Sequence, residues 1–508
     1  MEALQRLIPR GLPVSLQVVA ATLVFGILYS IITADRPFAG FTIVAVDGKS
    51  PTKSWIWYGK ETINEGLRKF SGPFQVMTGT GPKIVLPNKY ADEIRNNPLL
   101  DFNKAFAKDF MIHYPGFDGV RMSLQSHILP ETIRTKLTQS LGLVTDDLVD
   151  ETIASVYDVM GESEQWTTRL IRKDMLEVVA RLSSRVFLGR ELCRNRRWLD
   201  IAKTYTIDVF LTSRLMRAVP SFLRPIAYLF IPGSKSLRSA VRDARKLIDP
   251  EVQRRKATVD AALAAGEKPP KTADTIGWIY EVAKGADVDI VAGQLSLTMA
   301  AIHTTTETSC SALFDICQYP DVAQQLREEI VQVIGENGWH KTSLYKLKLM
   351  DSFLKEGQRV RPMNESSMHR YAEERVELSD GTVIPKGSRI IVVNNYNDPT
   401  IFEEPEKFDA ARFLKMRQKA GQEHNWQFVT TGASQTLFGH GQHACPGRFF
   451  ASNELKILLC HLLLKYDWRF VPGEGRPKAG SFEGNNGVAD DSKIQARRRR
   501  PEIDLDNL

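Results

Sequence analysis

Along most of residues 90–360, apolar residues recur every three to four positions, the period of amphipathic helices. One example of this spacing is the set Ile153, Val156, Tyr157 and Met160. A long pattern of this kind predicts one helix over about 287–318, which stops before Pro320, the expected first residue of the next helix. Another helix is expected over 349–360, closed by Pro362. The middle of the chain is therefore predicted to be mainly helical.

Short runs rich in β-branched and aromatic residues predict a smaller β part on both sides of this helical middle. The expected strands are 56–58, 74–77, 84–86, 382–384 and 388–393. Residues 78–83 contain glycine and lysine but lack the spacing of a phosphate-binding loop, so they are expected to form a hairpin turn. The charged stretch 254–271, with Pro269 and Pro270, is expected to be an exposed linker. The fold class is thus predicted to be mainly α with a smaller β part.

Residues 12–34 form an apolar stretch without any charge. A helix needs about 20 residues to span a bilayer, whereas the apolar region of a cleaved signal peptide has about 7–15. We therefore expect a retained transmembrane helix, with an anchor over residues 1–36 and one catalytic domain over 37–508. Arg6 and Arg10 precede the stretch and Arg36 follows it, so charge alone leaves its orientation open.

Composition and charge narrow the class of protein. Of 508 residues, 43% are hydrophobic and 25% charged, which is enough to build a large core. The net charge of +7 is too small for a nucleic-acid-binding surface, so no nucleic-acid partner is expected. The basic cluster 497–500 is expected to lie on a solvated terminal strand, with a weak contact to lipid or an acidic partner as the alternative. Five cysteines without a regular pattern argue against a disulfide framework and for a reducing compartment.

The strongest chemical signal is the stretch 438–448, Phe-Gly-His-Gly-Gln-His-Ala-Cys-Pro-Gly-Arg, followed by an apolar helical pattern. Its glycines permit a tight backbone around Cys445, and the helix that follows would point its first amides toward the sulfur, which favours a thiolate. Taken alone, the motif leaves two alternatives. One is a zinc site made by His440, His443 and Cys445, although its spacing fits no common zinc pattern, and the other is a structural cysteine.

The spacing of Phe438, Gly441, Cys445 and Gly447 resembles the haem-binding loop of the cytochrome P450 family, in which the cysteine is the axial ligand of the iron. The resemblance implies that Cys445 binds the iron of haem b and that the loop around it binds the cofactor.

Upstream, Glu356 and Arg359 resemble the family's Glu-x-x-Arg motif. Together with Arg412 they would form the buried Glu-Arg-Arg network of the family, a scaffold for the cysteine loop rather than a group that takes part in the chemistry.

Residues 300–305, Ala-Ala-Ile-His-Thr-Thr, resemble the oxygen-binding segment of the same family. The resemblance implies that Thr304 supports proton delivery. His303 occupies the position of the family's acid and is a candidate proton relay. A threonine that only bonds back to the preceding helical turn is the alternative for Thr304.

Two positions depart from the family pattern near the expected haem propionates. His443 stands where the family often has arginine, and the usual Trp-x-x-x-Arg is not evident over 127–141. Arg370 stands where the family commonly has a propionate-binding arginine, with a plain surface arginine as the alternative. The apolar stretch 210–232 falls where the family has substrate-entry helices that touch the membrane.

The resemblance covers nearly the whole chain, and its motifs occur in the family's order. It implies a cytochrome P450 fold behind one transmembrane helix, with the catalytic domain facing the cytosol from the endoplasmic reticulum. The loop is most similar to those of fungal members that oxidise secondary metabolites such as terpenoids. The implied activity is insertion of one oxygen atom into an apolar small molecule.

Electrons would come from NADPH–cytochrome P450 reductase, since the chain carries no flavin or nicotinamide motif. The alternatives are a haem-thiolate isomerase or dehydratase of the same fold, and a haem sensor or carrier.

Overall fold

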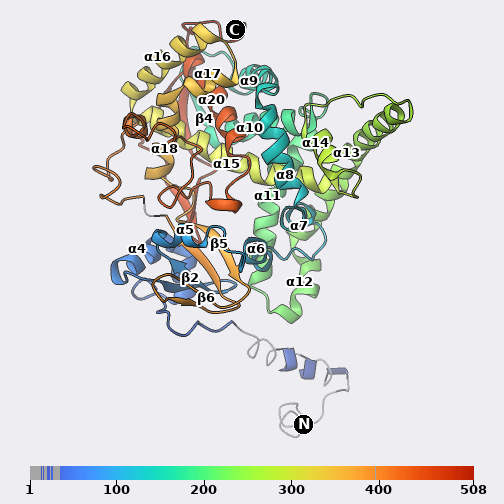
Figure 1. The fold of residues 1–508 in the computed structure, drawn as a ribbon, viewed down its shortest axis with the longest axis vertical. Coiled ribbons are helices and arrows are strands. Elements are labelled where there is room, and N and C mark those ends of the chain that lie inside the picture. The colour runs from blue at the N-terminus through green and yellow to red at the C-terminus, as the bar shows by residue number, and fades with distance from the viewer. Residues whose placement is uncertain (1–12, 14, 17–19, 23, 27–34, 395) are drawn as a thin grey trace.

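The computed structural model describes residues 13, 15–16, 20–22, 24–26, 35–394 and 396–508. Most of this chain is helical, and its largest sheet lies at one end of the molecule, beside the helices that come first in the sequence (Figure 1). From residue 51 onward, the α-helices span Pro51–Trp57 (α3), Gly59–Lys69 (α4), Ala91–Ile94 (α5), Phe102–Phe110 (α6), Asp118–Gln125 (α7), Ile128–Thr132 (α8), Thr145–Met160 (α9), Ile171–Leu188 (α10), Arg196–Arg217 (α11), Arg224–Phe230 (α12), Pro232–Ala264 (α13), Thr275–Ala283 (α14), Ile290–Gln318 (α15), Pro320–Asn337 (α16), Lys341–Lys346 (α17), Lys348–Val360 (α18), Arg412–Arg417 (α19) and Arg448–Lys465 (α20). The prediction of a mainly helical protein with a smaller β part is confirmed.

The largest sheet has five strands in the order β1-β2-β8-β5-β3. Only the β2–β8 pair is parallel, and the other neighbours are antiparallel. A second sheet of three strands has the order β4-β12-β9, and two hairpins, β10-β11 and β6-β7, complete the β part. The strands span Phe74–Thr78 (β1), Gly81–Leu86 (β2), Leu100–Asp101 (β3), Thr167–Leu170 (β4), Ser366–Ala372 (β5), Val376–Glu377 (β6), Val383–Ile384 (β7), Arg389–Val393 (β8), Tyr466–Arg469 (β9), Ala479–Phe482 (β10), Asn485–Val488 (β11) and Lys493–Arg498 (β12).

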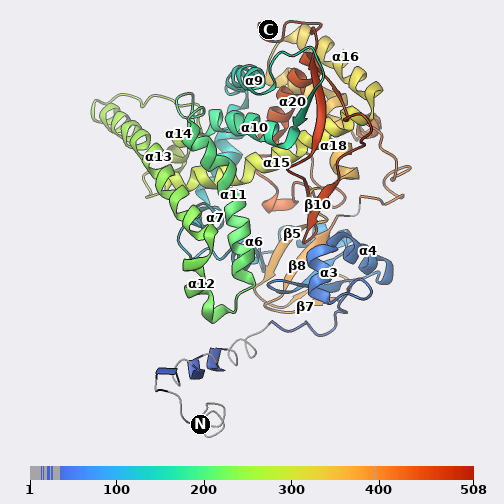
Figure 2. The same cartoon turned by 180° about the vertical axis from the view of Figure 1, so that it is seen from behind.

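Helix α15 crosses the centre of the helical part and packs against α7, α10 and α11 (Figure 2). The side chain of Asp289 caps its N-terminus by accepting a hydrogen bond from the amide of Ala292, 2.9 Å away. All residues from Ile290 to Thr298 are buried. The helix ends at Gln318, and Pro320 opens α16, as the sequence predicted.

Two local predictions are wrong. Residues 56–58 were expected to be a strand, but α3 covers 51–57 because Pro51 occupies its first turn and Trp55 is buried by packing. The expected linker 254–271 is helical as far as Ala264, at the end of α13. Its lysines, arginines and alanines are good helix formers, so their charge does not interrupt the helix.

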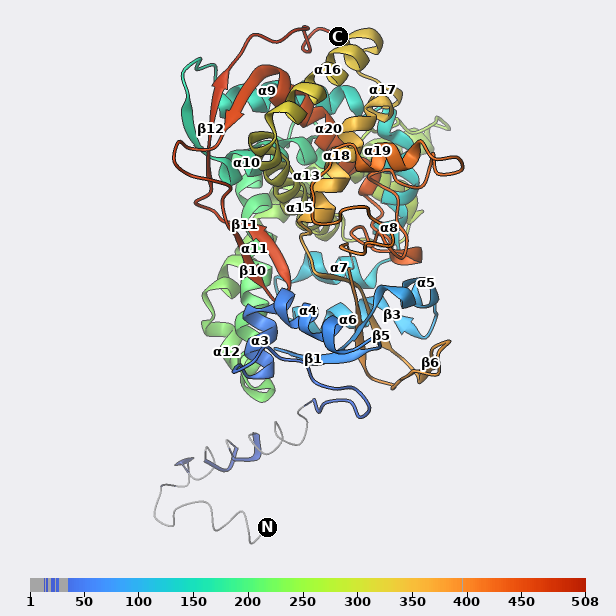
Figure 3. The same cartoon turned by 90° about the vertical axis from the view of Figure 1, so that its left-hand side faces the viewer.

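The C-terminal end of α11 is fastened to the turn between β10 and β11 (Figure 3). Arg217 forms an ion pair with Glu483, 3.3 Å away. The guanidinium carbon of Arg214 lies 3.7 Å from the ring centre of Phe482 and 5.3 Å from that of Trp57, in α3. These contacts join α11 to α3 and to the β10–β11 hairpin, although the three segments are far apart in the sequence.

The predicted transmembrane span 12–34 lies mostly outside the described residues. Among the residues that the structure does describe, none of the helices is both long and apolar enough to cross a bilayer. The division into an anchor over 1–36 and a domain over 37–508 therefore stays a prediction.

Candidate active site around Cys445

The loop that carries Cys445 is closed by a backbone hydrogen bond. The amide of Cys445 donates to the carbonyl of Phe438, 2.7 Å away. Between them, Gly439 and Gly441 have φ angles of +68° and +77°, which favour glycine. A Cβ on Gly441 would also lie 2.6 Å from the Cβ of Arg95. The glycine spacing of the motif therefore follows from the backbone shape of this loop and from its close contact with the residues after α5.

Cys445 lies just before α20, where backbone amides point at its sulfur. The amides of Gly447 and Arg448 donate hydrogen bonds to the sulfur and lower the pKa of the thiol, but burial is the larger effect and raises it. The side chain of Arg448 donates to the carbonyls of Cys445 and Val429, at 2.8 Å and 3.1 Å, and so fixes the loop. The site suits a thiolate whose charge is balanced by a bound cation.

The two histidines of the loop do not converge with Cys445 on a zinc site. His440 is buried and interacts with Asp92 at 2.9 Å and with Arg95 at 3.1 Å. The ring of His443 stacks on Phe102, with 5.1 Å between the ring centres. Among the described residues, no group of three or more His, Cys, Asp or Glu side chains could hold a metal ion. The zinc alternative therefore has no support in the geometry.

Glu356, Arg359 and Arg412 form one buried network. The carboxylate of Glu356 is 2.8 Å from Nε of Arg359 and 3.0 Å from Nε of Arg412. Arg359 also donates to the carbonyl of Tyr396, and Arg412 to the carbonyl of Lys407, both at 2.8 Å. The network joins α18 to the segment around α19, and all three charged side chains are buried.

The same helix α18 also holds the segment that leads to the cysteine loop. The ammonium group of Lys355 donates to the carbonyls of Gln427 and Thr430, at 2.8 Å and 3.2 Å. Arg448, from the other side, donates to Val429. Helices α18 and α20 thus bind one stretch of backbone between them, and this links the position of Glu356 to that of Cys445.

One face of α15 is exposed although most of the helix is buried. Ala300 and Thr304, four residues apart and thus on one face, are exposed, while the intervening Ile302 and the next residue, Thr305, are buried. The hydroxyl of Thr304 donates to the carbonyl of Ala300, 2.9 Å away. This exposed surface of Ala300 and Thr304 is called the open face of α15 below.

His303 does not share that face. Its Nε2 lies 3.1 Å from the carbonyl oxygen of Lys203, in α11. Burial, and then the charge of Arg172, lower the pKa of His303 to about 4, so the imidazole is neutral at pH 7. The structure therefore brings Thr304, but not His303, to the open face, and the relay role of His303 stays a prediction without geometric support.

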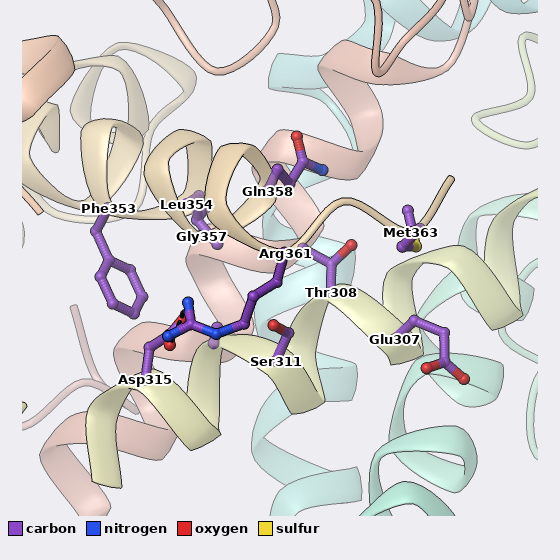
Figure 4. Close-up of a pocket in the computed structure, with 11 residues that line it drawn as sticks. Glu307, Thr308, Ser311, Asp315, Phe353, Leu354, Gly357, Gln358, Arg361 and Met363 are labelled. Atoms are coloured by element: carbon purple, nitrogen blue, oxygen red, sulfur yellow. Dashed lines mark ion pairs between the residues drawn. The ribbon is translucent and has the colours of Figure 1, made fainter. Parts of the chain in front are cut away.

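A small cavity of about 20 Å³, room for about one water molecule, separates α15 from α18 (Figure 4). Asp315, on α15, pairs there with Arg361 at 3.0 Å and with Arg476 at 2.6 Å. Ser311, one turn earlier, accepts a hydrogen bond from Arg476 at 3.1 Å. The cluster fastens α15 to the end of α18, so the helices of Thr304 and Glu356 are held together.

The model of the family described as cytochrome P450 matches residues 123–490, more than half of the chain. The chain belongs to the cytochrome P450 family. Membership implies a haem bound through a cysteine thiolate, and it confirms the predicted family.

Fungal cytochrome P450 monooxygenases are similar to the chain over most of its length. The monooxygenase bsc2 of Alternaria brassicicola is 44% identical over 92% of this chain and 91% of its own. The monooxygenase 1 of Gibberella fujikuroi is 41% identical over 85% of this chain and 98% of its own. The monooxygenase adrA of Penicillium rubens is 38% identical over 97% of each chain. These relatives confirm the predicted class of enzyme, a cytochrome P450 monooxygenase.

A solved structure, retinoic acid bound cyanobacterial CYP120A1, is similar in fold. The TM-score is 0.67, and the match covers 91% of this chain and 100% of that chain at 16% identity. The predicted cytochrome P450 fold is thereby confirmed.

Arg370 fits a haem propionate because it is a buried cation that lacks an acidic partner. It is 1% exposed, and its Nε has no hydrogen-bond partner. Its Nη1 donates to the carbonyl of His369, 2.9 Å away, and its Nη2 to the carbonyl of Arg95, 3.5 Å away. Its guanidinium carbon lies 5.8 Å from the ring centre of Phe102. A buried charge of this kind is costly unless it is paired. A carboxylate of the cofactor would supply the missing partner.

Arg134 is a second candidate, which the sequence motif did not reveal. Its side chain donates to the carbonyl of Gln442, 2.5 Å away, directly before His443. Burial, followed by the charges of Arg370 and Arg134, lowers the pKa of His443 to about 4. No described carboxylate forms an ion pair with either arginine. Arg134 is exposed, whereas Arg370 is buried. Haem carries two propionates, so two arginines without an acidic partner beside the cysteine loop fit it.

Arg134 lies inside the segment 127–141, in which the Trp-x-x-x-Arg motif is not evident. The only signal available was its position in that segment, because the tryptophan of the motif is absent. Phe102, whose ring contacts both His443 and Arg370, was also missed, since nothing local marks it.

We expect Arg370→Leu to weaken haem retention. Hydrogen bonds to charged groups contribute about 1.5–3 kcal/mol, so haem transfer to excess apomyoglobin should be accelerated about tenfold or more. Absorbance of the acceptor measures the rate. Arg375→Leu is the matched control, because that arginine pairs on the surface with Glu377. Equal rates for the wild type and Arg370→Leu would remove Arg370 from the haem site.

Proposed function

We propose that the protein is a haem-thiolate monooxygenase in which Cys445 would bind the iron of haem b through its thiolate. The observation that carries the proposal is the position of Cys445 directly before α20, where the backbone amides of Gly447 and Arg448 lower the pKa of its thiol, in a loop whose Gly439 and Gly441 have positive φ angles. Phe438, Gly441, His443 and Gly447 shape that loop, and Arg370 and Arg134 would hold the propionates. When bound, the thiolate haem supplies the activation of oxygen.

Thr304 is the residue proposed to serve proton delivery. Its hydroxyl lies on the open face of α15 and can exchange its bond to the Ala300 carbonyl for one to a ligand or water. A relay role of His303 stays a prediction, and its ring is held against the Lys203 carbonyl of α11.

The substrate is proposed to be an apolar small molecule, oxidised in the biosynthesis of a terpenoid or related fungal secondary metabolite. The similarity to fungal monooxygenases supports a biosynthetic role. NADPH–cytochrome P450 reductase is the proposed electron donor, because residues 1–508 carry no flavin or nicotinamide motif that could supply the electrons.

The protein is further proposed to be a single-pass protein of the endoplasmic reticulum membrane with a cytosolic catalytic domain. The uncharged stretch 12–34 is long enough for a span. Exposed apolar side chains gather on α11 and α12, among them Phe230, 79% exposed, and Leu229, 62% exposed. Such surfaces favour contact with lipid or another protein over water.

The two alternatives differ from the proposal in what they consume. An isomerase or dehydratase of this fold would turn over substrate without NADPH and oxygen, and a haem sensor would turn over nothing. Coupled consumption of NADPH and oxygen by the protein with its reductase, together with an oxygenated product, supports the proposal. Product formation without them would contradict it.

Thr304→Val should uncouple this reaction. We expect NADPH to be consumed at a rate similar to that of the wild type, while product per NADPH falls about tenfold or more, since a positioned proton-transfer group contributes about 100- to 10,000-fold. Thr306→Val is the matched control. The hydroxyl of Thr306 also donates to the carbonyl four residues earlier, that of Ile302, but Thr306 is fully buried. Equal coupling in both variants would assign Thr304 the role of an ordinary helix residue.

A further inference from the structure

The C-terminal part of α13, residues 251–264, projects from the body of the protein (Figure 1, Figure 2). The last buried residue of this helix is Ile248, and Pro250 lies inside the helix just after it. A proline within a helix removes one backbone hydrogen bond. Isolated helices shorter than about 12–15 residues are marginal in water, so this part of the helix depends on few contacts. Residues 251–264 can therefore unwind locally while the rest of the protein stays folded.

An ion pair ties the projecting segment to α14. Nη1 of Arg255 lies 2.6 Å from Oδ1 of Asp274. Asp274 is 7% exposed, and its carboxylate caps α14 by accepting a hydrogen bond from the amide of Gly277, 3.1 Å away. A buried carboxylate is costly without a charged partner. The charge of Arg255 therefore stabilises both the cap of α14 and the position of the segment.

Thr258 lies on this segment, shortly after a run of three basic residues. Arg254, Arg255 and Lys256 precede it, and the apolar Val259 follows it. Thr258 is exposed, and its hydroxyl donates to the carbonyl of Arg254, 3.0 Å away, within the segment itself. Many protein kinases select basic residues a few positions before the target hydroxyl and bind the target chain in an extended form. An exposed hydroxyl after basic residues, on backbone that can unwind, meets both requirements.

Ser71 has similar neighbours in the sequence but a more firmly held backbone. It is exposed, and Arg68 and Lys69 precede it. The ring of Phe70, directly before it, stacks on Phe74, with 6.4 Å between the ring centres. Phe74 begins β1 and Lys69 ends α4, so regular structure holds the chain on both sides of Ser71. Ser71 therefore serves as the comparison for Thr258.

We propose that Thr258 is phosphorylated by a protein kinase that selects basic residues, and that the phosphate draws Arg255 away from Asp274. The γ-phosphoryl group of ATP is transferred to Oγ1 of Thr258, its bond to the β-phosphate oxygen breaks, ADP leaves, and the base of the kinase takes the hydroxyl proton. Phosphothreonine carries a charge of about −1.5 to −2 at pH 7. Arg254 and Arg255 lie four and three residues before Thr258, on the same helix face and within reach of the phosphate.

The effect of the phosphate would reach α14 through Asp274. Without Arg255, the buried carboxylate of Asp274 loses its cation, so the cap of α14 becomes weaker. Helix α14 packs against α15, which carries Thr304. The phosphate would thus act on a helix beside the proposed active site without contact with haem or substrate. The inference goes beyond the proposed function and needs from it only the cytosolic position of the domain, where ATP and kinases are available.

The test incubates the full-length protein with ATP and the catalytic subunit of cAMP-dependent protein kinase, a kinase that selects basic residues. Tandem mass spectrometry locates the phosphate. We expect phosphate at Thr258 in the wild type and in Ser71→Ala, the matched control, and none at this position in Thr258→Ala. A wild type without phosphate at Thr258, or with phosphate at Ser71 alone, would overturn the proposal.

Hydrogen exchange of the phosphorylated protein tests the release of Arg255. The amides of α14 should exchange about two- to fivefold faster than without phosphate, the range of one partly exposed ion pair. Arg255→Gln should show a similar acceleration without phosphate, because it removes the same ion pair. Unchanged exchange of α14 after phosphorylation would contradict the release of Arg255. The spectrum of the reduced carbon monoxide complex, recorded on the same samples, tests haem-thiolate ligation separately, so failure of this inference is distinguished from failure of the proposed function.

Discussion

Replacing Glu356 by alanine should lower the free energy of unfolding by about 3–5 kcal/mol and leave a protein that retains little haem, because one buried anion holds two buried guanidinium groups. Glu356 is 0% exposed, and its carboxylate contacts Arg359 and Arg412 at 2.8 Å and 3.0 Å. Without it, both cations stay in the interior without an acidic partner. Since α18 also holds residues 427–430 through Lys355, the loss should extend to the segment before the cysteine loop.

Urea unfolding and the haem absorbance of the purified protein measure the two effects. Glu356→Gln keeps the shape of the side chain and loses the charge, so it should show most of the destabilisation. Glu406→Ala is the control, because Glu406 is an exposed acid that forms no ion pair within the described structure. A Glu356→Ala protein with the stability and haem content of Glu406→Ala would show that the network is dispensable.

The elements that could be predicted were those with local signals. Proline marked the junction of α15 and α16, and the glycine turn marked the β1–β2 hairpin, whose register pairs Thr78 with Gly81. Residues 56–58 have strand-forming side chains, yet they end a helix, because the burial of Trp55 and the contact of Trp57 with Arg214 outweigh propensity. The burial of Trp55 and the contact of Trp57 with Arg214 both depend on segments that are distant in the sequence.

The residues of the candidate site also fall into two groups: those with a local sequence signal and those that only the folded structure brings together. Cys445, Glu356 and Arg359 belong to motifs with fixed local spacing, so the sequence was sufficient to find them. Arg134 acts on a carbonyl 308 residues further along the chain, and only the folded structure brings them together.

His303 shows the limit of a motif read without geometry. It is adjacent to Thr304 in sequence, but consecutive residues of a helix point in different directions. Its ring therefore meets the Lys203 carbonyl of α11 and not the open face of α15.

Cys445→Ala should abolish both thiolate ligation and monooxygenase turnover. The thiolate is the nucleophilic ligand, and alanine offers no atom to bind iron. Haem held by Arg370 and Arg134 alone would lack this axial bond, so any retained cofactor should behave as ordinary, non-thiolate haem. Cys317→Ala is the matched control, because Cys317 is a partly exposed cysteine of α15, outside the loop.

The most direct test is the optical spectrum of the reduced protein with carbon monoxide, recorded for the full-length wild type, Cys445→Ala and Cys317→Ala. The account predicts the red-shifted Soret band of thiolate-bound haem in the wild type and in Cys317→Ala, and its absence in Cys445→Ala. A folded wild type without that band, or a band that survives in Cys445→Ala, would contradict the assignment of Cys445 as the ligand.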